Sequence, residues 1–439
     1  MSDQRTTVYA KKLSCMISKN TVSCSDCKDT AKFREFHELL RKLFPDIFSC
    51  CEFEDHSGSF VMRWKGKSDA APILLMNHHD VVEAPGKWDH DPFSGDICDG
   101  RLWGRGTLDD KGGLFAMLEA ADELAKVGFV PKADIYFMST CNEETDSKGA
   151  KEIANIFEKR GLRFRFSLDE GGLILNDPIV GAKGMHAMVG MGEKGCADIK
   201  FTARSSGGHA SIPAKNTPLI RLAKFMADVE KTRAFKAHIS PTLHEMFKRL
   251  SSSMHGPLKF VLGHSKFFAP ILSAAIPKVS AVCNAMLKTT IAFTMAQGSD
   301  GPNVLPEEAW VIGNMRYSAH QGKQASIEAV TKLAAKSDIE THVIDSGMAS
   351  PVTDHKSDEF KLIEKAIDNV FGHIKTIPYI MLGASDSCYI SKVCNSCLRF
   401  TPFYTDDQQF ASLHGKNENV YLSSLIPAVD FFRYIITEA

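Results

Sequence analysis

Apolar and polar residues follow two different periods along the first part of the chain. At 31–45 and 109–126, apolar positions recur at helical spacing, and the second stretch begins with acidic residues and ends with lysine, as the helix dipole favours. Short apolar runs at 59–64 and 73–76 predict strands instead. This alternation favours an α/β fold, in which a mixed, mostly parallel sheet is flanked by helices.

The pattern changes after about residue 192. A half-exposed strand at 197–204 is followed by an amphipathic helix at 217–229 and a helical stretch at 236–288. Three further strands are predicted at 289–295, 310–317 and 340–344, and a helix is predicted at 323–336. This βαββαβ-like order is typical of a small sheet with helices on one face.

Because the α/β pattern resumes after about Ser350, the second unit is predicted to be inserted into the first. We expect a catalytic domain in two parts, 1–192 and 350–439, and an inserted α+β domain at 193–349. At 439 residues the chain is too long for one ordinary core, which agrees with two domains.

Composition and charge exclude some classes of function. With 44% hydrophobic and 24% charged residues, the chain resembles an ordinary soluble enzyme, and its net charge of −1 gives no field that would attract nucleic acid. We therefore expect no nucleic-acid partner. The N-terminus has no apolar stretch of signal-peptide length, which predicts a cytoplasmic protein whose 12 cysteines are mainly reduced thiols.

The predicted helical stretch contains one long apolar segment. Residues 267–287 are about long enough to span a bilayer, and Lys278 is their only charge. Pro270 and Pro277 interrupt the segment, since proline kinks or ends a helix. We expect short packed helices and no membrane span, with a span or contact with a membrane as the alternative.

Polar residues that suit a metal site follow several of the apolar runs. His78 comes just after the run at 73–76 and can bind a metal, while Asp80 can fix its imidazole tautomer. Asp109 follows two glycines that allow a tight turn, and a carboxylate there can bridge two cations. The alternative for His78 and Asp80 is that they are ordinary polar residues at the end of a strand. The alternative for Asp109 is that it is the N-cap of the following helix, a role that Asp110 can also fill.

Further carboxylates follow predicted strands. Glu143 and Glu144 come after a predicted strand at 134–140. Adjacent carboxylates on a turn can point in different directions, so that one binds a metal and the other acts as a general base. The alternative is a solvent-exposed acidic turn. Asp169 ends the next strand-like run, and ligand sites in open α/β sheets gather at such strand ends. With His414 near the C-terminus, the set suits a two-zinc hydrolase.

These residues lie in motifs that resemble a known family. In order along residues 70–420, NHHDVV, GRGTLDDKGG, NEE, LDEGG and LHGKNE are similar to the motifs of the co-catalytic zinc metallopeptidases. That family includes aminoacylase, vacuolar carboxypeptidase S, carnosinase-like dipeptidases and succinyl-diaminopimelate desuccinylase. The long helical stretch in the inserted unit looks most like the carboxypeptidase S and N-fatty-acyl-amino-acid hydrolase branch.

The resemblance implies two Zn²⁺ per subunit, with Co²⁺ or Mn²⁺ as alternatives. One ion would be held by His78 and Asp169 and the other by Glu144 and His414, with Asp109 bridging both.

Other roles follow from the same resemblance. Glu143 would be the general base, and Glu170 is the alternative to Asp169 as a ligand. The peptide between Asp109 and Asp110 is expected to be cis.

The inserted domain would be the family's lid and dimerisation domain. In SSGGHASIP, His209 resembles a lid histidine that reaches the substrate carbonyl oxygen, often in the partner's site; a plain loop residue is the alternative. Asn303 and Arg316 match substrate-contacting positions, and Arg316 would pair with a carboxylate unless it is a surface arginine at a strand end. The resemblance therefore implies a homodimer.

GASDS at 383–387 resembles a loop that lines the substrate side of the site, which makes Gly383 a candidate contact. Two departures from the family pattern, Ala384 in place of glycine and Cys388 in place of arginine, bear on substrate identity more than on the metal site.

The implied activity is hydrolysis of an amide bond. We expect an exopeptidase, either a carboxypeptidase or a dipeptidase, that acts on small peptides with a free C-terminal carboxylate. The alternative is an N-acyl-amino-acid hydrolase, and a non-catalytic metal-binding dimer is a third hypothesis. Four apolar residues of the insert can either line an acyl pocket or form lid core, namely Phe267, Phe268, Ile271 and Leu272.

Two Cys-x-x-Cys pairs are also present, Cys24 with Cys27 and Cys394 with Cys397. Their spacing allows a four-cysteine zinc site, with ordinary reduced thiols as the alternative.

Overall fold

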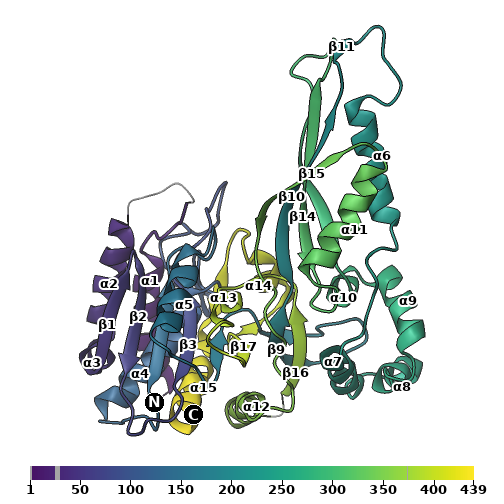
Figure 1. Ribbon diagram of the computed structural model, residues 1–439. Coiled ribbons are helices and arrows are strands. Elements are labelled where there is room, and N and C mark those ends of the chain that lie inside the picture. The colour runs from purple at the N-terminus through teal and green to yellow at the C-terminus, as the bar shows by residue number, and fades with distance from the viewer. Residues whose placement is uncertain (1, 25–29, 373) are drawn as a thin grey trace.

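A ten-stranded sheet forms the centre of the main body (Figure 1). The computed structural model describes residues 2–24, 30–372 and 374–439. The strand order is β1-β2-β6-β3-β7-β17-β9-β8-β18, and β16 pairs with β9. The strands are β1 (Cys51–His56), β2 (Ser59–Trp64), β3 (Ile73–His78), β6 (Ile135–Thr140), β7 (Ser167–Asp169), β8 (Ile174–Asn176), β9 (Met185–Glu193), β16 (Lys375–Met381), β17 (Cys397–Arg399) and β18 (Tyr404–Thr405).

Helices cover both faces of this sheet. On β3, Leu75 packs into the cluster that contains α4 and α15, whereas Leu74 packs into the cluster on the opposite face that contains α5. A strand buried on both faces is apolar at every position, which explains the unbroken run at 73–76. The first face carries α1 (Ser2–Ile17), α2 (Ala31–Leu43), α3 (Pro45–Cys50), α4 (Lys111–Lys126), α12 (Asp358–Phe371) and α15 (Leu425–Glu438), and the second carries α5 (Lys148–Lys159) and α13 (Ser387–Ile390).

Parallel pairing brings the candidate site residues to one edge. β3 is parallel to β6 and to β7, with His78 opposite Thr140 and Leu75 opposite Leu168. The residues that follow these three strands therefore emerge at the same carboxyl edge, where open α/β sheets bind ligands. The predicted fold class, a mixed and mostly parallel sheet flanked by helices, is confirmed.

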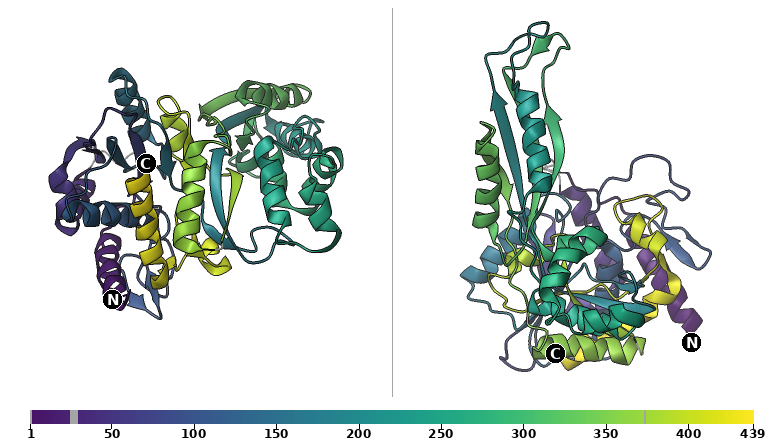
Figure 2. Two further views of the ribbon diagram at one scale, coloured as in Figure 1. Left: turned by 90° about the horizontal axis from the view of Figure 1, so that it is seen from below. Right: turned by 90° about the vertical axis from the view of Figure 1, so that its right-hand side faces the viewer.

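A second, four-stranded antiparallel sheet extends away from the main body (Figures 1 and 2). Its order is β12-β14-β10-β15, and the short pair β11/β13 lies at its far tip. Its elements are β10 (Gly195–Arg204), β11 (Gly208–His209), α6 (Pro218–Lys231), β12 (Thr290–Gln297), β13 (Val304–Leu305), β14 (Glu308–Tyr317), α11 (Lys323–Ala335) and β15 (Glu340–Ser346). The predicted strands and helices of this α+β unit are all present.

The chain leaves and re-enters the main body at neighbouring points. The backbone N–H of Glu193 donates to Ser350 Oγ (3.1 Å), and the N–H of Thr353 donates to the carbonyl of Met191 (2.7 Å). Buried Arg399 donates from Nε to Glu193 Oε2 (3.0 Å), which fixes this junction to the sheet. The domain limits at 193 and 349 stay a prediction.

The helices between α6 and β12 pack beside β16 rather than on the small sheet. Leu243 and Phe247 of α7 share a buried cluster with Ile377 of β16. The apolar segment 267–287 forms two short helices, with Pro277 inside the first and a break at Ser280. Within the described ranges, no helix combines the length and apolarity that crossing a bilayer requires. These helices are α7 (Pro241–Ser251), α8 (Gly256–Gly263), α9 (Ala269–Val279) and α10 (Ala281–Leu287).

One buried carboxylate holds the loop that carries Asp109. Glu418 precedes β19 (Asn419–Tyr421), which pairs with β5 (Arg101–Trp103), itself paired with β4 (Ile97–Cys98). Its Oε2 accepts from Arg105 Nη1 (2.7 Å) and from the N–H of Gly106 (3.0 Å), and its Oε1 accepts from the N–H of Leu108 (2.8 Å) and of Asp109 (3.2 Å). Glu418 and Arg105 are both fully buried, so the pair fixes the loop without competition from water.

We expect Glu418→Gln to lower the free energy of unfolding by about 3–5 kcal/mol, because it leaves the Arg105 charge buried without a counter-charge. Urea denaturation measures this. The matched control is Glu54→Gln, which removes the partner of Arg160 from a surface pair and should cost about 0–1 kcal/mol. Equal losses in the two variants would show that the buried pair does not fix the loop.

Candidate metal centre and adjoining cavity

Two imidazole rings approach the Asp109 carboxylate from opposite ends of the chain. His78 Nε2 lies 2.9 Å from Asp109 Oδ1, and His414 Nε2 lies 3.0 Å from Asp109 Oδ2 and 3.2 Å from Glu144 Oε2. The turn before α4 delivers Asp109 to this position through a cis peptide to Asp110, as expected. Asp110, not Asp109, occupies the N-cap position of α4, and its side chain accepts from Asn77.

The donor set fits a divalent cation. Among the described residues, His78, Asp109 and Glu144 form a group whose ligand atoms all lie within 4.8 Å of one another. Glu144 Oε1 is buried, and no described group donates a hydrogen bond to it. Imidazole nitrogen and carboxylate oxygen are the ligands that zinc takes in hydrolytic sites, and an unsatisfied buried oxygen in such a group suits a metal.

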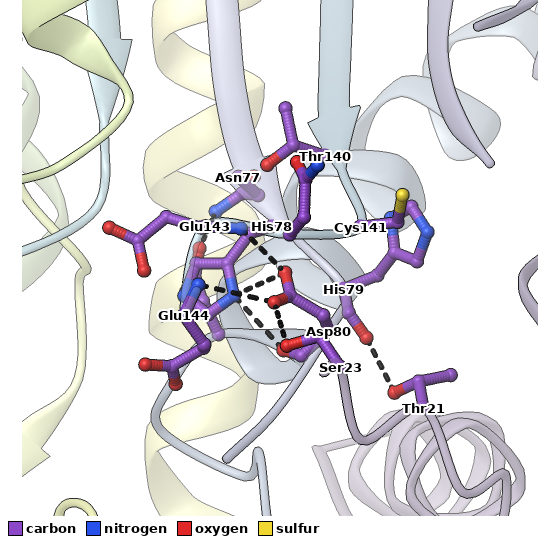
Figure 3. Close-up of polar contacts among 12 residues, drawn as sticks. Thr21, Ser23, Asn77, His78, His79, Asp80, Thr140, Cys141, Glu143 and Glu144 are labelled. Atoms are coloured by element: carbon purple, nitrogen blue, oxygen red, sulfur yellow. Dashed lines mark hydrogen bonds and ion pairs between the residues drawn. The ribbon is translucent and has the colours of Figure 1, made fainter. Parts of the chain in front are cut away.

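Asp80 organises the backbone around these ligands (Figure 3). Its Oδ1 accepts from the N–H of Glu143 (3.2 Å) and its Oδ2 from the N–H of Glu144 (3.1 Å). The backbone carbonyl of Asp80 lies 3.0 Å from His78 Nδ1; because a carbonyl only accepts, Nδ1 carries the proton and Nε2 is free to bind a metal. Figure 3 shows the Glu143 and Glu144 carboxylates pointing away from Asp80 and diverging from each other.

The N-terminal segment completes this arrangement, and sequence reasoning missed it. Ser23 Oγ donates to Asp80 Oδ2 (2.7 Å), and Thr21 Oγ1 donates to the carbonyl of His79 (2.6 Å), as Figure 3 shows. Lys111 Nζ, at the start of α4, donates to the carbonyls of Met16 and Lys19. No motif marks these residues, because isolated serine and threonine hydroxyls carry no recognisable spacing.

The electrostatics of the site follow from buried carboxylates around two imidazoles. Burial raises the pKa of Glu143 well above its usual value, and the nearby charge of Asp386 raises it further. Hydrogen bonds to Asp109 and Glu144 raise the pKa of His414 to about 10. Burial lowers the pKa of His78, but its hydrogen bond to Asp109 contributes to a net pKa well above the usual value. Such excess negative charge is what a divalent cation neutralises.

Two acidic side chains lie at the end of β7, which pairs with β3: Asp169 is the last residue of the strand, and Glu170 follows it. Asp169 is buried, and its Oδ2 accepts from the N–H of Ser387 (3.0 Å) at the start of α13. Glu170, the alternative ligand, lies in the wall of the cavity described below, and burial raises its pKa well above the usual value, with Asp109 and Asp169 adding to the effect.

Two of the candidate lid residues, His209 and Asn303, lie at the tip of the second sheet, and the third, Arg316, lies near the other end of β14. His209 belongs to β11, at the exposed tip of the second sheet (Figure 1), and its Nδ1 lies 2.7 Å from Ser211 Oγ. Asn303 lies beside it, because its carbonyl accepts from the N–H of Ala210 (3.0 Å). Arg316, on β14, donates from Nε to Asn314 Oδ1 (3.1 Å).

A cavity of about 460 Å³ adjoins the metal ligands. Asp109, Glu143, Glu144 and His414 lie in its wall, and so does Gly383; that Gly383 contacts a substrate stays a prediction. Most of the remaining wall is apolar, contributed by Leu173, Leu175, Ile179, Met188, Val282, Met286, Tyr379, Met381, Leu382 and Phe410. The last of these is on α14 (Asp407–Ser412).

The helical insert contributes to this cavity, but through other residues than the sequence suggested. Val282 and Met286 of α10 line it. Of the residues considered for an acyl pocket or lid core, Leu272 is buried among the helices, whereas Phe267 and Ile271 are exposed.

The hypothesis of a four-cysteine zinc site receives no support from its second pair. Cys394 and Cys397 are buried in the apolar cluster beneath α5, where each thiol donates to a backbone carbonyl. Cys27 lies outside the described residues.

Comparisons with known proteins agree with this geometry. The model of the peptidase family M20/M25/M40 matches residues 74–438. The human N-fatty-acyl-amino acid synthase/hydrolase PM20D1 is 29% identical, over 94% of this chain and 84% of its own length. A probable carboxypeptidase S-like 2 from Dictyostelium discoideum is 31% identical, over 92% of this chain and 79% of its own length.

Solved structures share the fold along nearly the whole chain. An M20 family metallo-carboxypeptidase from Sulfolobus solfataricus superposes with a TM-score of 0.70 at 16% identity, covering 98% of both chains. The di-peptidase Dug1p from Saccharomyces cerevisiae gives a TM-score of 0.68 at 16% identity, covering 99% of this chain and 96% of that one. The family match covers most of the chain and confirms the resemblance drawn from the motifs, so the chain belongs to the peptidase family M20/M25/M40 and is a metal-dependent hydrolase of peptide or amide bonds.

Proposed function

We propose that this enzyme is a dinuclear metal amidohydrolase that releases an amino acid with a free carboxylate from an apolar acyl group. The apolar cavity beside Glu143 and Asp109 carries the proposal, because an aliphatic chain placed there extends directly from the reacting amide. The names of two relatives, an N-fatty-acyl-amino acid synthase/hydrolase and a carboxypeptidase S-like protein, support an acylated amino acid or peptide as substrate.

Five side chains would hold two cations. His78 and Asp169 would bind one, Glu144 and His414 the other, and Asp109 would lie between them. Zinc suits these nitrogen and oxygen donors, with cobalt or manganese as alternatives. When bound, such ions polarise the amide carbonyl and lower the pKa of a water molecule.

Glu143 would move the proton. Its carboxylate accepts a proton from the attacking water and returns it to the nitrogen of the leaving amine. Asp80 supports this role because it holds the backbone N–H of Glu143, which leaves the carboxylate free to face the cavity.

The tip of the second sheet would act in a homodimer. His209 lies far from the metal centre of its own chain (Figure 1), so we propose that the partner's His209 stabilises the oxyanion. Asn303 lies beside it at this tip and would contact the substrate there. Arg316 would pair with the substrate carboxylate and Gly383 would line the substrate side of the site.

A small-peptide exopeptidase is the second candidate. Four carboxylates line the same cavity, and they would pair with the ammonium group of a dipeptide or tripeptide, which an N-acyl amino acid lacks. They are Glu170, Asp177, Asp406 and Asp407.

Glu143→Gln keeps the size of the side chain but removes its ability to accept a proton. We expect kcat/KM to fall by about 10²–10⁴-fold, with the metal content per chain unchanged. Steady-state kinetics and elemental analysis measure the two quantities, and Glu158→Gln, an exposed glutamate of α5, is the control. A variant that retains both full turnover and its metal would remove Glu143 as the base.

Chelation should abolish activity, and Zn²⁺, Co²⁺ or Mn²⁺ should restore it at a stoichiometry of two ions per chain, because the ligand set divides into two groups that share Asp109. Titration followed by elemental analysis gives the stoichiometry. Saturation of activity at one ion per chain would contradict a dinuclear centre.

Phe410 lines the cavity but is 53% exposed, so it can be truncated with little effect on the core. We expect Phe410→Ala to lower kcat/KM for long-chain N-acyl amino acids by about tenfold, since lost apolar contact weakens only their binding. Its kcat/KM for N-acetyl amino acids should be unchanged, and the control variant Val127→Ala should behave like the original enzyme with both substrates.

Faster turnover of dipeptides than of any acyl series would instead favour the exopeptidase. Equal turnover of substrates with an amidated carboxyl group would contradict the role of Arg316.

A further inference from the structure

Helix α9 has no polar side. Its sequence, APILSAAIPKV, contains one serine and one lysine as its only polar side chains. Leu272 and Ile276 are buried against the neighbouring helices, while Ile271 and Val279 on the outer side are exposed. A helix that is apolar all round is normally buried on all sides, so the outer side of α9 is typical of a surface that a partner covers.

Several exposed apolar side chains lie in this region. On α9 and just before it, Phe267 is 81% exposed, Ile271 63% and Val279 78%. The rings of Phe260 and Phe267 both contact Phe268, at 5.9 and 5.0 Å between centroids, which joins α8 to α9. We define the apolar patch as Val180, Leu258, Phe260, Phe267, Ile271 and Val279.

This patch lies on the outer side of the molecule, away from the ligands of the metal centre. In Figure 1, α8 and α9 are at the right-hand margin, and the same side faces the viewer in the right panel of Figure 2. The second sheet and its tip point in another direction, so a partner at the patch leaves the tip accessible.

Lysines are the charged residues within the segment that carries most of the patch. The chain has 53 acidic residues in total, yet none lies between Glu245 and Asp300. Lys259, Lys266 and Lys278 are exposed in this interval, next to the apolar side chains. Two carboxylates border the patch, and both are paired with a cation: Asp177 with Lys183 (2.5 Å), and Glu245, which lines a hollow with Lys266 and Phe267, with Arg249 (2.9 Å). In a chain with a net charge of −1, this is a local cationic and apolar surface.

The patch also borders the substrate cavity. A shallow hollow beside Val180 is lined by Ile179 and Val282, and both of these residues line the cavity next to the metal centre as well. An apolar molecule at the patch is therefore one side-chain layer from the cavity.

We propose that the apolar patch docks on the surface of a bilayer that contains anionic phospholipids. The aromatic and aliphatic side chains enter the boundary between headgroups and acyl chains, and the three lysines contact lipid phosphates and carboxylates. Both parts are needed, since the side chains supply apolar contact and the lysines supply the charge complementarity that selects anionic lipid. The proposal does not depend on which amide the enzyme cleaves.

Flotation of the metal-loaded, full-length enzyme with lipid vesicles tests the proposal. We expect the enzyme to float with phosphatidylcholine vesicles that contain phosphatidylserine and to remain in solution with phosphatidylcholine alone, and high salt should weaken binding because it screens the lysine charges. Binding that is absent with both lipids, or equal with both, would overturn the assignment to anionic lipid.

Two double variants separate the contribution of the apolar side chains to vesicle binding from that of the lysine charges. Phe267→Ser with Ile271→Ser removes the two most central apolar side chains, and Lys259→Glu with Lys266→Glu reverses two charges; each should lower the vesicle partition coefficient by about tenfold or more. The matched control, Val127→Ser with Val130→Ser, changes two exposed apolar residues outside the patch and should bind like the original enzyme. All of these residues are exposed, and circular dichroism checks folding.

Sedimentation equilibrium distinguishes the other possible occupant, a second copy of the chain. If the Phe267/Ile271 variant changes a dimer to a monomer and leaves vesicle binding intact, the patch is an interface between copies and the lipid proposal is wrong. If the control loses vesicle binding as much as the patch variant does, binding is not specific to the patch and the proposal is also wrong.

Discussion

The arrangement of the site depends on the hydrogen bonds that the buried carboxylate of Asp80 accepts. It joins three segments that are distant in sequence, because it accepts hydrogen bonds from the backbone of Glu143 and Glu144 and from the hydroxyl of Ser23. By holding the backbone at these positions, it leaves both glutamate carboxylates free and directs them apart. A buried anion satisfied by several donors is rigid, and that rigidity is what a metal centre and a general base require.

The opposite side of the centre is fixed in the same way by Glu418. It binds the loop that carries Asp109 through four hydrogen bonds, and Arg105 neutralises its charge. The ligands are therefore placed by two buried carboxylates that do not themselves need to touch a metal. The remaining negative charge is concentrated on Asp109, Glu144 and their neighbours, and a bound cation would balance it.

The candidate metal ligands, the wall of the cavity and the tip with His209 come from different parts of the molecule. The candidate metal ligands lie at the carboxyl edge of the parallel strands, the cavity wall comes partly from α10 of the insert, and the tip with His209 lies at the end of a second sheet. The insert thus contributes in two ways: its helices pack beside β16 and line the cavity, while its sheet extends outward. The residues that α10 contributes to the cavity wall are separate from the candidate ligands, and the family contains relatives named as carboxypeptidase-like and as acyl-amino-acid hydrolases.

The sequence by itself determined the strand and helix pattern, the fold class and the family, because apolar periodicity and short motifs are local properties of the chain. It also singled out His78, Asp109, Glu144 and His414, which the fold brings together. Only the tertiary structure decided that Ser23 and Glu418 support these residues and that Asp110 rather than Asp109 takes the N-cap position. It also decided that Phe267 and Ile271 are exposed and lie outside the cavity beside the candidate metal ligands. Those outcomes depend on contacts between distant segments and on which side of a uniformly apolar helix is covered, and neither is encoded in local spacing.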